Sequence, residues 1–264
     1  MKKFKPAFYT FLLALILFAL FRLVNLNSIP VFADEAIYVR WSQVMRAEAT
    51  LRFLPLSDGK QPLAMWLTIP FLKLFSDPLI AGRTVSIIAG LGTLVGLSFL
   101  TYLLFGSLVL AAFSALVYAV LPFTVFFDRM ALVDSLLSMF GVWSLALSVL
   151  FSKTKRLDHA MFTGFAIGGG LITKSPAIFF YVWLVISFIF FNNLSEIKKN
   201  IKNILFGALA IIIISQGINS ILRLGPGFGM IGSRNQDYVF SISEVFTHPL
   251  NPLAGNIKTT LTWL

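Results

Sequence analysis

Long apolar stretches separated by short polar breaks dominate the chain. A helix needs about 20 apolar residues to cross the roughly 30 Å hydrocarbon core of a bilayer. Seven stretches approach or reach that length, at 8–26, 84–105, 107–127, 134–152, 160–173, 176–191 and 201–219. The pattern therefore predicts an all-α integral membrane protein, a polytopic helical bundle of about seven spans.

The first stretch is preceded by Lys2, Lys3 and Lys5. A signal peptide has an apolar region of about 7–15 residues followed by a small-residue cleavage site. The stretch 8–26 is longer and runs into the sequence FRLVNL. We therefore predict an uncleaved membrane anchor.

The basic residues orient the predicted bundle. With the N-terminus inside and seven crossings, the basic segments 153–156 and 198–202 both fall inside, as the positive-inside rule requires. This count holds only if segment 62–75 does not cross. That segment has about 14 residues and carries Lys73, so we expect an interfacial or re-entrant helix there. The predicted location is the plasma membrane, with a cytoplasmic N-terminus.

The charge distribution follows this topology. The chain has 21 Lys and Arg against 11 Asp and Glu, a net charge of +10. Nine of the acidic residues lie outside, since only Asp158 and Glu196 fall in inner segments. The basic excess is therefore topological, and nucleic acid has no support as a partner. We expect any chemistry on the outer face.

Composition excludes several other classes of protein. The chain is 58% hydrophobic and 12% charged, with a mean hydropathy of +0.87, whereas soluble domains carry about 25% charged residues. It has no cysteine, which excludes a disulfide framework, thiolate metal sites and cysteine nucleophiles. The sequence also lacks a Walker loop, a GxGxxG fingerprint and an HExxH motif.

The first outer loop, 27–83, carries adjacent carboxylates at the start of a predicted juxtamembrane helix. Asp34 and Glu35 fit an N-cap and a first-turn acid, where the helix dipole favours negative charge. They also fit catalysis: Asp34 is a candidate general base. Glu35 is then a helper that orients Asp34 or pairs with Arg40 or Arg83.

Two lysines lie at positions near the membrane surface, where they could bind a lipid-linked phosphate. Lys60 lies in a DGKQPL turn before an apolar helix with a tryptophan, and Lys174 lies in a TKSP break between two predicted spans. Lysine is a good point-charge partner for phosphate, and an ionisable residue at membrane depth is a functional hypothesis. The alternatives are a snorkelling lysine at position 60 and a plain polar hairpin at position 174.

These features in this order resemble the GT-C polyprenyl-phosphate-sugar glycosyltransferases. The nearest groups are the dolichyl-phosphate-mannose protein mannosyltransferases and the bacterial aminoarabinose transferases of lipid A. The Asp-Glu pair resembles the hallmark of their first outer loop. The stretch from Lys60 to Leu63 resembles their Lys-Pro-Pro-Leu, with Gln61 in place of the first proline.

The resemblance continues over about residues 8–195. Ala81-Gly82-Arg83 resembles an Ala-x-Arg segment of the family. The stretch from Arg129 to Asp134 resembles its Arg-x-x-x-x-Asp, and LITKSP resembles its Leu-x-x-Lys-Gly-Pro, with Ser175 in place of glycine. An ion pair between Arg129 and Asp134, or a helix cap, would explain Asp134 without function.

The resemblance implies a hexosyl- or pentosyltransferase of the cell envelope. It would transfer a sugar from a polyprenyl-phosphate donor to a protein, lipid or glycan acceptor on the extracytoplasmic face, with inversion in a single displacement. Asp34 is then the catalytic base and Glu35 its helper. Lys60, Lys174 and Arg129 bind the donor phosphate, and Asp134 is an additional active-site carboxylate. A divalent cation held by Asp34, Glu35 and Asp134 stays open, and no other cofactor is assigned.

Other classes stay open as well. A transporter or flippase fragment is one, although transporters place polar residues near the bilayer midplane, where this chain has Phe, Leu, Ile and Ala. A non-catalytic membrane partner of such an enzyme is another. A two-carboxylate glycosidase is disfavoured, because such a site does not require a transmembrane chain.

We divide the chain into a GT-C-like transmembrane domain, 1–219, and a second outer loop with the start of a further span, 220–264. That loop contains Arg223, Arg234 and Asp237. Either arginine could close over the donor phosphate or the acceptor, and the alternative is an ordered connecting loop without such a role. Because the sequence ends in TWL without a polar tail, we expect a truncated chain.

Overall fold

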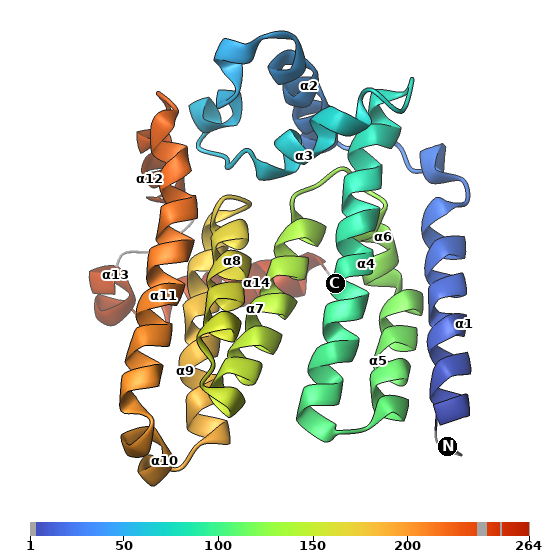
Figure 1. Ribbon diagram of the computed structural model, residues 1–264. Coiled ribbons are helices and arrows are strands. Elements are labelled where there is room, and N and C mark those ends of the chain that lie inside the picture. The colour runs from blue at the N-terminus through green and yellow to red at the C-terminus, as the bar shows by residue number, and fades with distance from the viewer. Residues whose placement is uncertain (1–3, 237–241, 249, 264) are drawn as a thin grey trace.

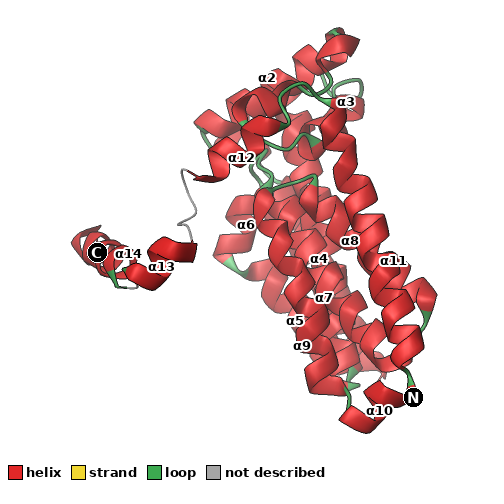
Figure 2. Cartoon of the chain, turned by 90° about the vertical axis from the view of Figure 1, so that its left-hand side faces the viewer, coloured by secondary structure: helices red, strands yellow, loops and turns green. Residues whose placement is uncertain are grey.

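The computed structural model describes residues 4–236, 242–248 and 250–263, so Asp237 lies outside the described residues. All regular elements in those ranges are helical. The helices pack side by side as a bundle, as Figures 1 and 2 show. The main helices are α1 (Phe4–Leu23), α4 (Pro78–Phe105), α5 (Leu108–Val120), α6 (Pro122–Asp128), α7 (Asp134–Thr154), α8 (Leu157–Leu171), α9 (Phe180–Phe191) and α11 (Ile201–Asn219).

Short helices cover the two ends of the bundle. At the upper end in Figure 1 lie α2 (Ala33–Ala47), α3 (Leu63–Phe71) and α12 (Gly229–Gln236). At the lower end lie the N-terminus and α10 (Leu194–Lys199), with its two lysines. The remaining described helices are α13 (Ile242–Thr247) and α14 (Asn251–Trp263). The predicted outer loop 27–83 and the predicted inner basic segment 198–202 are therefore at opposite ends.

The prediction of an all-helical membrane bundle is confirmed, but the predicted number of spans was too high. Within the described ranges, four helices are long and apolar enough to cross a membrane, in α1, α4, α7 and α11. The bent pair of α5 and α6 raises this number to five. The pair bends by 65° at Pro122, because proline removes a backbone donor and disfavours a helical residue before it.

The two other predicted spans form helices shorter than an ordinary span. The helix α8 has 15 residues, and α9 has 12, although α9 and the 3₁₀ turn before it together form an apolar helix over Ser175–Phe191. At 1.5 Å per residue these are about 22 Å and 18 Å, against roughly 30 Å of hydrocarbon. The reason is the TKSP break, which ends α8 and starts the 3₁₀ turn η4 (Ser175–Phe179).

Small residues let the long helices approach one another. In α8, a Cβ at Gly169 would come within 2.3 Å of the Phe140 ring on α7. In α11, a Cβ at Gly207 would come within 2.2 Å of the Phe151 ring. Close approach at small residues is the usual basis of helix packing inside membranes, where no hydrophobic effect drives the helices together.

The predicted first outer loop, 27–83, forms a helical cap on the ends of α4 and α7. The predicted juxtamembrane helix is α2, and the predicted non-crossing segment holds α3, whose nine residues span about 14 Å. Tyr38 and Met45 of α2 and Met65 of α3 are buried together with Leu132 and Leu136. This core fixes the cap on the bundle and positions the start of α2, where the two adjacent carboxylates lie.

Candidate active site

Glu35 is the anchor of the cap. It is fully buried and forms a two-point ion pair with Arg83, whose Nε and Nη2 donate to the two carboxylate oxygens at 2.9 and 3.0 Å. The backbone N–H groups of Ala131 and Phe32 donate to the same carboxylate at 2.7 and 3.1 Å. Of the two arginines considered from sequence, Arg83 is therefore the partner.

These contacts keep Glu35 charged. Burial alone would raise the pKa of its carboxyl, but the hydrogen bonds from Arg83, Ala131 and Phe32 outweigh burial and hold the pKa below its usual value. A carboxylate whose oxygens are all engaged is a poor proton acceptor. Arg83 also donates to the carbonyls of Leu26 and Ile29, so the pair ties the end of α1 to α2, α4 and the segment before α7.

Asp34 has a different environment from its neighbour. Its side chain is 43% exposed and faces Lys60, whose Nζ lies 3.4 Å from Asp34 Oδ1. Successive residues of a helix differ by about 100° in direction, so α2 turns Glu35 into the cap and Asp34 toward its surface. The sequence Asp-Glu therefore gives one accessible carboxylate beside one buried one.

Lys60 is held by charge and by aromatic rings. Its Nζ is 3.4 Å from Asp58 Oδ2 as well as from Asp34, and it lies 4.9 Å from the centre of the Tyr38 ring and 5.6 Å from that of Trp41. Cation–π contacts of this kind stabilise an ammonium group that is partly removed from water. The side chain is only 15% exposed.

A second carboxylate–lysine pair lies nearby. Lys174 Nζ donates to Asp134 Oδ1 at 2.8 Å, and both side chains are partly exposed. Asp134 begins α7, and Lys174 is the extended residue between α8 and η4. The partner of Asp134 is thus Lys174, not the Arg129 considered from sequence.

The two lysine-bearing loops are joined. Gln61 Nε2 donates to Ser175 Oγ at 2.8 Å, and the Leu63 N–H donates to the Ile172 carbonyl at 3.2 Å.

Burial raises the pKa of the Tyr38 hydroxyl, and the charges of Asp34 and Asp134 raise it further. The phenol therefore keeps its proton at neutral pH.

Arg129 lies in another set of contacts. Its Nη1 and Nη2 donate to the carbonyls of Phe21 and Asn25 at 2.9 and 2.6 Å, at the end of α1. Its Nε is buried and has no hydrogen-bond partner among the described residues. The structure gives Arg129 a role in holding α1, and its assignment to the donor phosphate stays a prediction.

Sequence analysis missed a buried ion pair behind Asp134. Arg22 Nε donates to Asp128 Oδ2 at 2.8 Å, and both residues are buried. Asp128 also accepts from Tyr118 and from Ser135, the residue after Asp134. Arg22 lies in the first apolar stretch, and an ionisable residue there was the available signal for a buried partner. The pair anchors the start of α7.

The predicted second outer loop contacts the predicted first one. Arg234 of α12 contacts Asp58, with 3.2 Å between Nη1 and Oδ1. Gly59, whose φ of +65° suits glycine, lies directly beneath Arg234 and the Met230 carbonyl. Of the two arginines that could close over the site, Arg234 is thus linked through Asp58 to Lys60.

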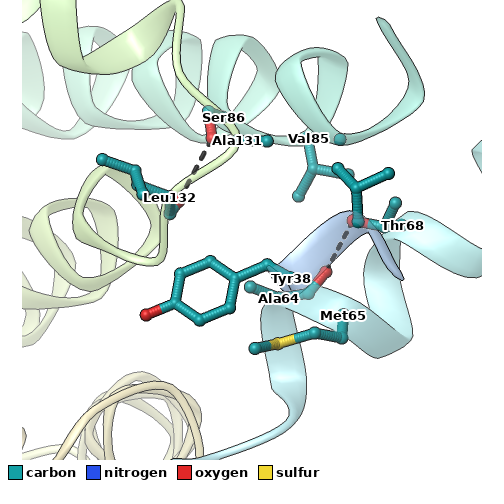
Figure 3. A pocket seen from close by; sticks show the side chains of 10 residues that line it. Tyr38, Ala64, Met65, Thr68, Val85, Ser86, Ala131 and Leu132 are labelled. Atoms are coloured by element: carbon teal, nitrogen blue, oxygen red, sulfur yellow. Dashed lines mark hydrogen bonds between the residues drawn. The ribbon is translucent and has the colours of Figure 1, made fainter. Parts of the chain in front are cut away.

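The cap holds a small cavity and no recognisable metal centre. Figure 3 shows side chains that line the cavity, among them Tyr38, Ala64, Met65 and Leu132. Its volume of about 10 Å³ suits one water molecule at most, so it is not a substrate site. In the part of the chain that the structure describes, no three His, Cys, Asp or Glu residues form a metal-binding group, so Asp34, Glu35 and Asp134 do not form one.

Comparison with known proteins gives one match. A family model described as dolichyl-phosphate-mannose-protein mannosyltransferase matches residues 59–218, more than half of the chain. The match includes Lys60, Asp134 and Lys174 and begins after Asp34. The comparisons with curated proteins and with solved structures give no match.

Proposed function

The chain belongs to the dolichyl-phosphate-mannose-protein mannosyltransferase family and is a membrane glycosyltransferase, and we propose that Asp34 is the general base of its transfer reaction. The donor is a sugar on a polyprenyl phosphate. The acceptor is a hydroxyl of a protein, lipid or glycan at the extracytoplasmic face of the plasma membrane.

One observation carries this proposal: two carboxylate–lysine pairs lie on joined loops at one end of the bundle. Asp34 faces Lys60, and Asp134 faces Lys174. The leaving polyprenyl phosphate gains negative charge as its bond to the sugar breaks. Cations fixed beside that phosphate stabilise this charge. The lysines suit that task, and a carboxylate beside them suits proton removal.

The reaction is a single displacement at the anomeric carbon. The acceptor oxygen forms a bond to that carbon while the bond from the carbon to the phosphate oxygen breaks, and its electron pair goes to the phosphate. The hydroxyl proton goes to a carboxylate oxygen of Asp34, which must be ionised and within hydrogen-bond reach. The products are an inverted glycoside and polyprenyl phosphate.

The two ion pairs differ in length, and the difference suits a reaction in which the donor binds before Asp34 accepts the proton. The 3.4 Å between Lys60 and Asp34 is longer than an ordinary charge-assisted hydrogen bond, whereas the 2.8 Å between Lys174 and Asp134 is typical of one. A donor phosphate that binds Lys60 competes with Asp34 for the ammonium group. Donor binding therefore frees Asp34 as a base, while Asp134 keeps Lys174 in place.

Glu35 acts as the positioning residue for Asp34. Its buried contacts with Arg83, Ala131 and Phe32 fix the first turn of α2. The neighbouring carboxylate is then presented in one direction without a mobile loop. This arrangement supports a division of labour in which Asp34 reacts and Glu35 does not.

The ends of the bundle support the proposed orientation. The N-terminus and α10 lie at the end opposite the candidate site (Figure 1). Lys198 and Lys199 lie in the last turn of α10, and the positive-inside rule favours a cytoplasmic position for such residues. The site then faces the extracytoplasmic side, where a flipped lipid-linked sugar would be presented.

A donor panel tests the proposal. Native membranes containing the wild-type chain are given labelled sugars on polyprenyl phosphate, and transfer is compared with that in membranes lacking the chain. We expect transfer from at least one donor. Lys60→Gln should raise the KM for that donor by about tenfold or more, the loss expected for a charged hydrogen bond. Absence of transfer from every donor would contradict the proposed function.

A further inference from the structure

We propose that Gln61 and Ser175 form a latch that sets the spacing between Lys60 and Lys174, so that both lysines meet one donor phosphate. Gln61 and Ser175 are positioning residues in this proposal and do not react. The inference rests on the proposed function for its kinetic consequence. The latch itself is a structural claim that can be tested without activity.

The latch connects the residues next to the two lysines. Gln61 follows Lys60, and Ser175 follows Lys174. The bond from Gln61 Nε2 to Ser175 Oγ is 2.8 Å long, and Gln61 is only 6% exposed. A buried amide that loses its partner is costly, so this bond holds the two loops in one relative position.

Each lysine-bearing loop is also held in place locally by a backbone hydrogen bond. The latch is therefore needed to restrain the movement of one loop relative to the other. The Lys60 N–H donates to the Pro55 carbonyl at 3.0 Å, within the first loop. The Lys174 N–H donates to the Gly170 carbonyl at 3.0 Å, at the end of α8. Between the loops, the Gln61 side chain adds a contact directly beside the lysines, whereas the backbone bond from Leu63 lies farther along the chain.

The latch depends on the side chains at positions 61 and 175. A proline and a glycine at these positions could not form a side-chain hydrogen bond, whereas Gln61 and Ser175 form one. In the described chain no residue accepts a hydrogen bond from the Gln61 backbone N–H, so a proline there would break none.

The first test uses an isosteric pair at position 175. Ser175→Thr keeps the hydroxyl. Ser175→Val removes the hydroxyl, and valine has nearly the same side-chain volume as threonine. We expect Ser175→Val to lower kcat/KM for the donor by about tenfold or more, because small misplacements of binding groups are costly. The KM for the acceptor should stay unchanged, and Ser175→Thr should retain wild-type values. Equal kinetics for the two variants would overturn the latch.

The second test exchanges both positions. Gln61→Pro and Ser175→Gly are measured separately and together, as a double-mutant cycle. We expect each single variant to be impaired, because each leaves one partner without its bond, and the double variant to recover most of the loss. Additive losses would contradict the proposal.

The third test needs no activity. The chain has no cysteine, so spin labels at Ser57→Cys on η3 (Leu54–Asp58) and Phe179→Cys on η4 report only the separation of the two loops. We expect a narrow distance distribution that broadens with Ser175→Val and stays narrow with Ser175→Thr. Identical distributions would refute the latch. A narrow, latch-dependent distribution without any transfer would instead refute the proposed function alone.

Discussion

At the scale of single residues, adjacent carboxylates have opposite environments. Glu35 is fully buried among Arg83 and two backbone N–H donors, and Asp34 is partly exposed beside one lysine. Buried carboxylates with every oxygen engaged stabilise a fold, whereas an accessible carboxylate with a weakly held partner can exchange protons. We therefore assign stability to Glu35 and reactivity to Asp34.

The buried pair makes a direct prediction about stability. Glu35→Gln leaves the Arg83 guanidinium uncompensated in the cap, and breaking one side of a buried ion pair costs about 3–5 kcal/mol. We expect a clear drop in the melting temperature of the purified protein. Glu48→Gln, at the exposed end of the same helix, is the matched control and should melt like the wild type. Equal melting of both variants would contradict the anchor role.

The ion pair between Glu35 and Arg83 also makes the stability of the fold depend on pH. Because the pKa of Glu35 is lowered in the fold, its stabilisation is present above the ordinary carboxyl pKa of 4.5 and is lost as pH falls through the lowered value. The difference in melting temperature between the wild type and Glu35→Gln should therefore shrink in acid. A difference in melting temperature that stays constant from pH 7 to strongly acid conditions would contradict the lowered pKa of Glu35.

At the scale of elements, periodicity and apolar length predicted the helices well. The seven predicted apolar stretches all form helices, and segment 62–75 forms a short helix instead of a span, as expected. The error lay in the number of spans. The stretches 160–173 and 176–191, already divided at TKSP, were counted as two spans, but they form the helices α8 and α9, which have only 15 and 12 residues.

The pairings between elements could be predicted only in part. The Arg83 partner of Glu35 was among the alternatives, because both residues were expected at the outer ends of their helices. The pairs of Asp134 with Lys174 and of Asp128 with Arg22 join residues 40 and 106 positions apart. Such contacts depend on which helices are neighbours, and hydrophobic periodicity carries no information about that. The same holds for the bond between Gln61 and Ser175.

At the scale of the whole molecule, the proposed function requires the α2–α3 cap and α10 to lie on opposite sides of the membrane. Since the chain has no cysteine, single cysteines at Leu74 and Leu194, which are 74% and 77% exposed, suit labelling in intact cells. We expect a membrane-impermeant maleimide to label Leu74→Cys from outside and Leu194→Cys only after permeabilisation. The reverse pattern would place the candidate site on the cytoplasmic side and contradict the proposed topology.

The central claim is that Asp34 removes the acceptor proton, and the most direct measurement is kcat for sugar transfer by Asp34→Asn at saturating donor. The substitution keeps the size and position of the side chain and removes its basicity. General-base catalysis contributes typically about 10²- to 10⁴-fold. We predict a loss of kcat in that range, with donor binding retained and with Glu48→Gln unchanged. A kcat within about twofold of the wild type would remove Asp34 from the mechanism, because the loss expected of a general base is far larger.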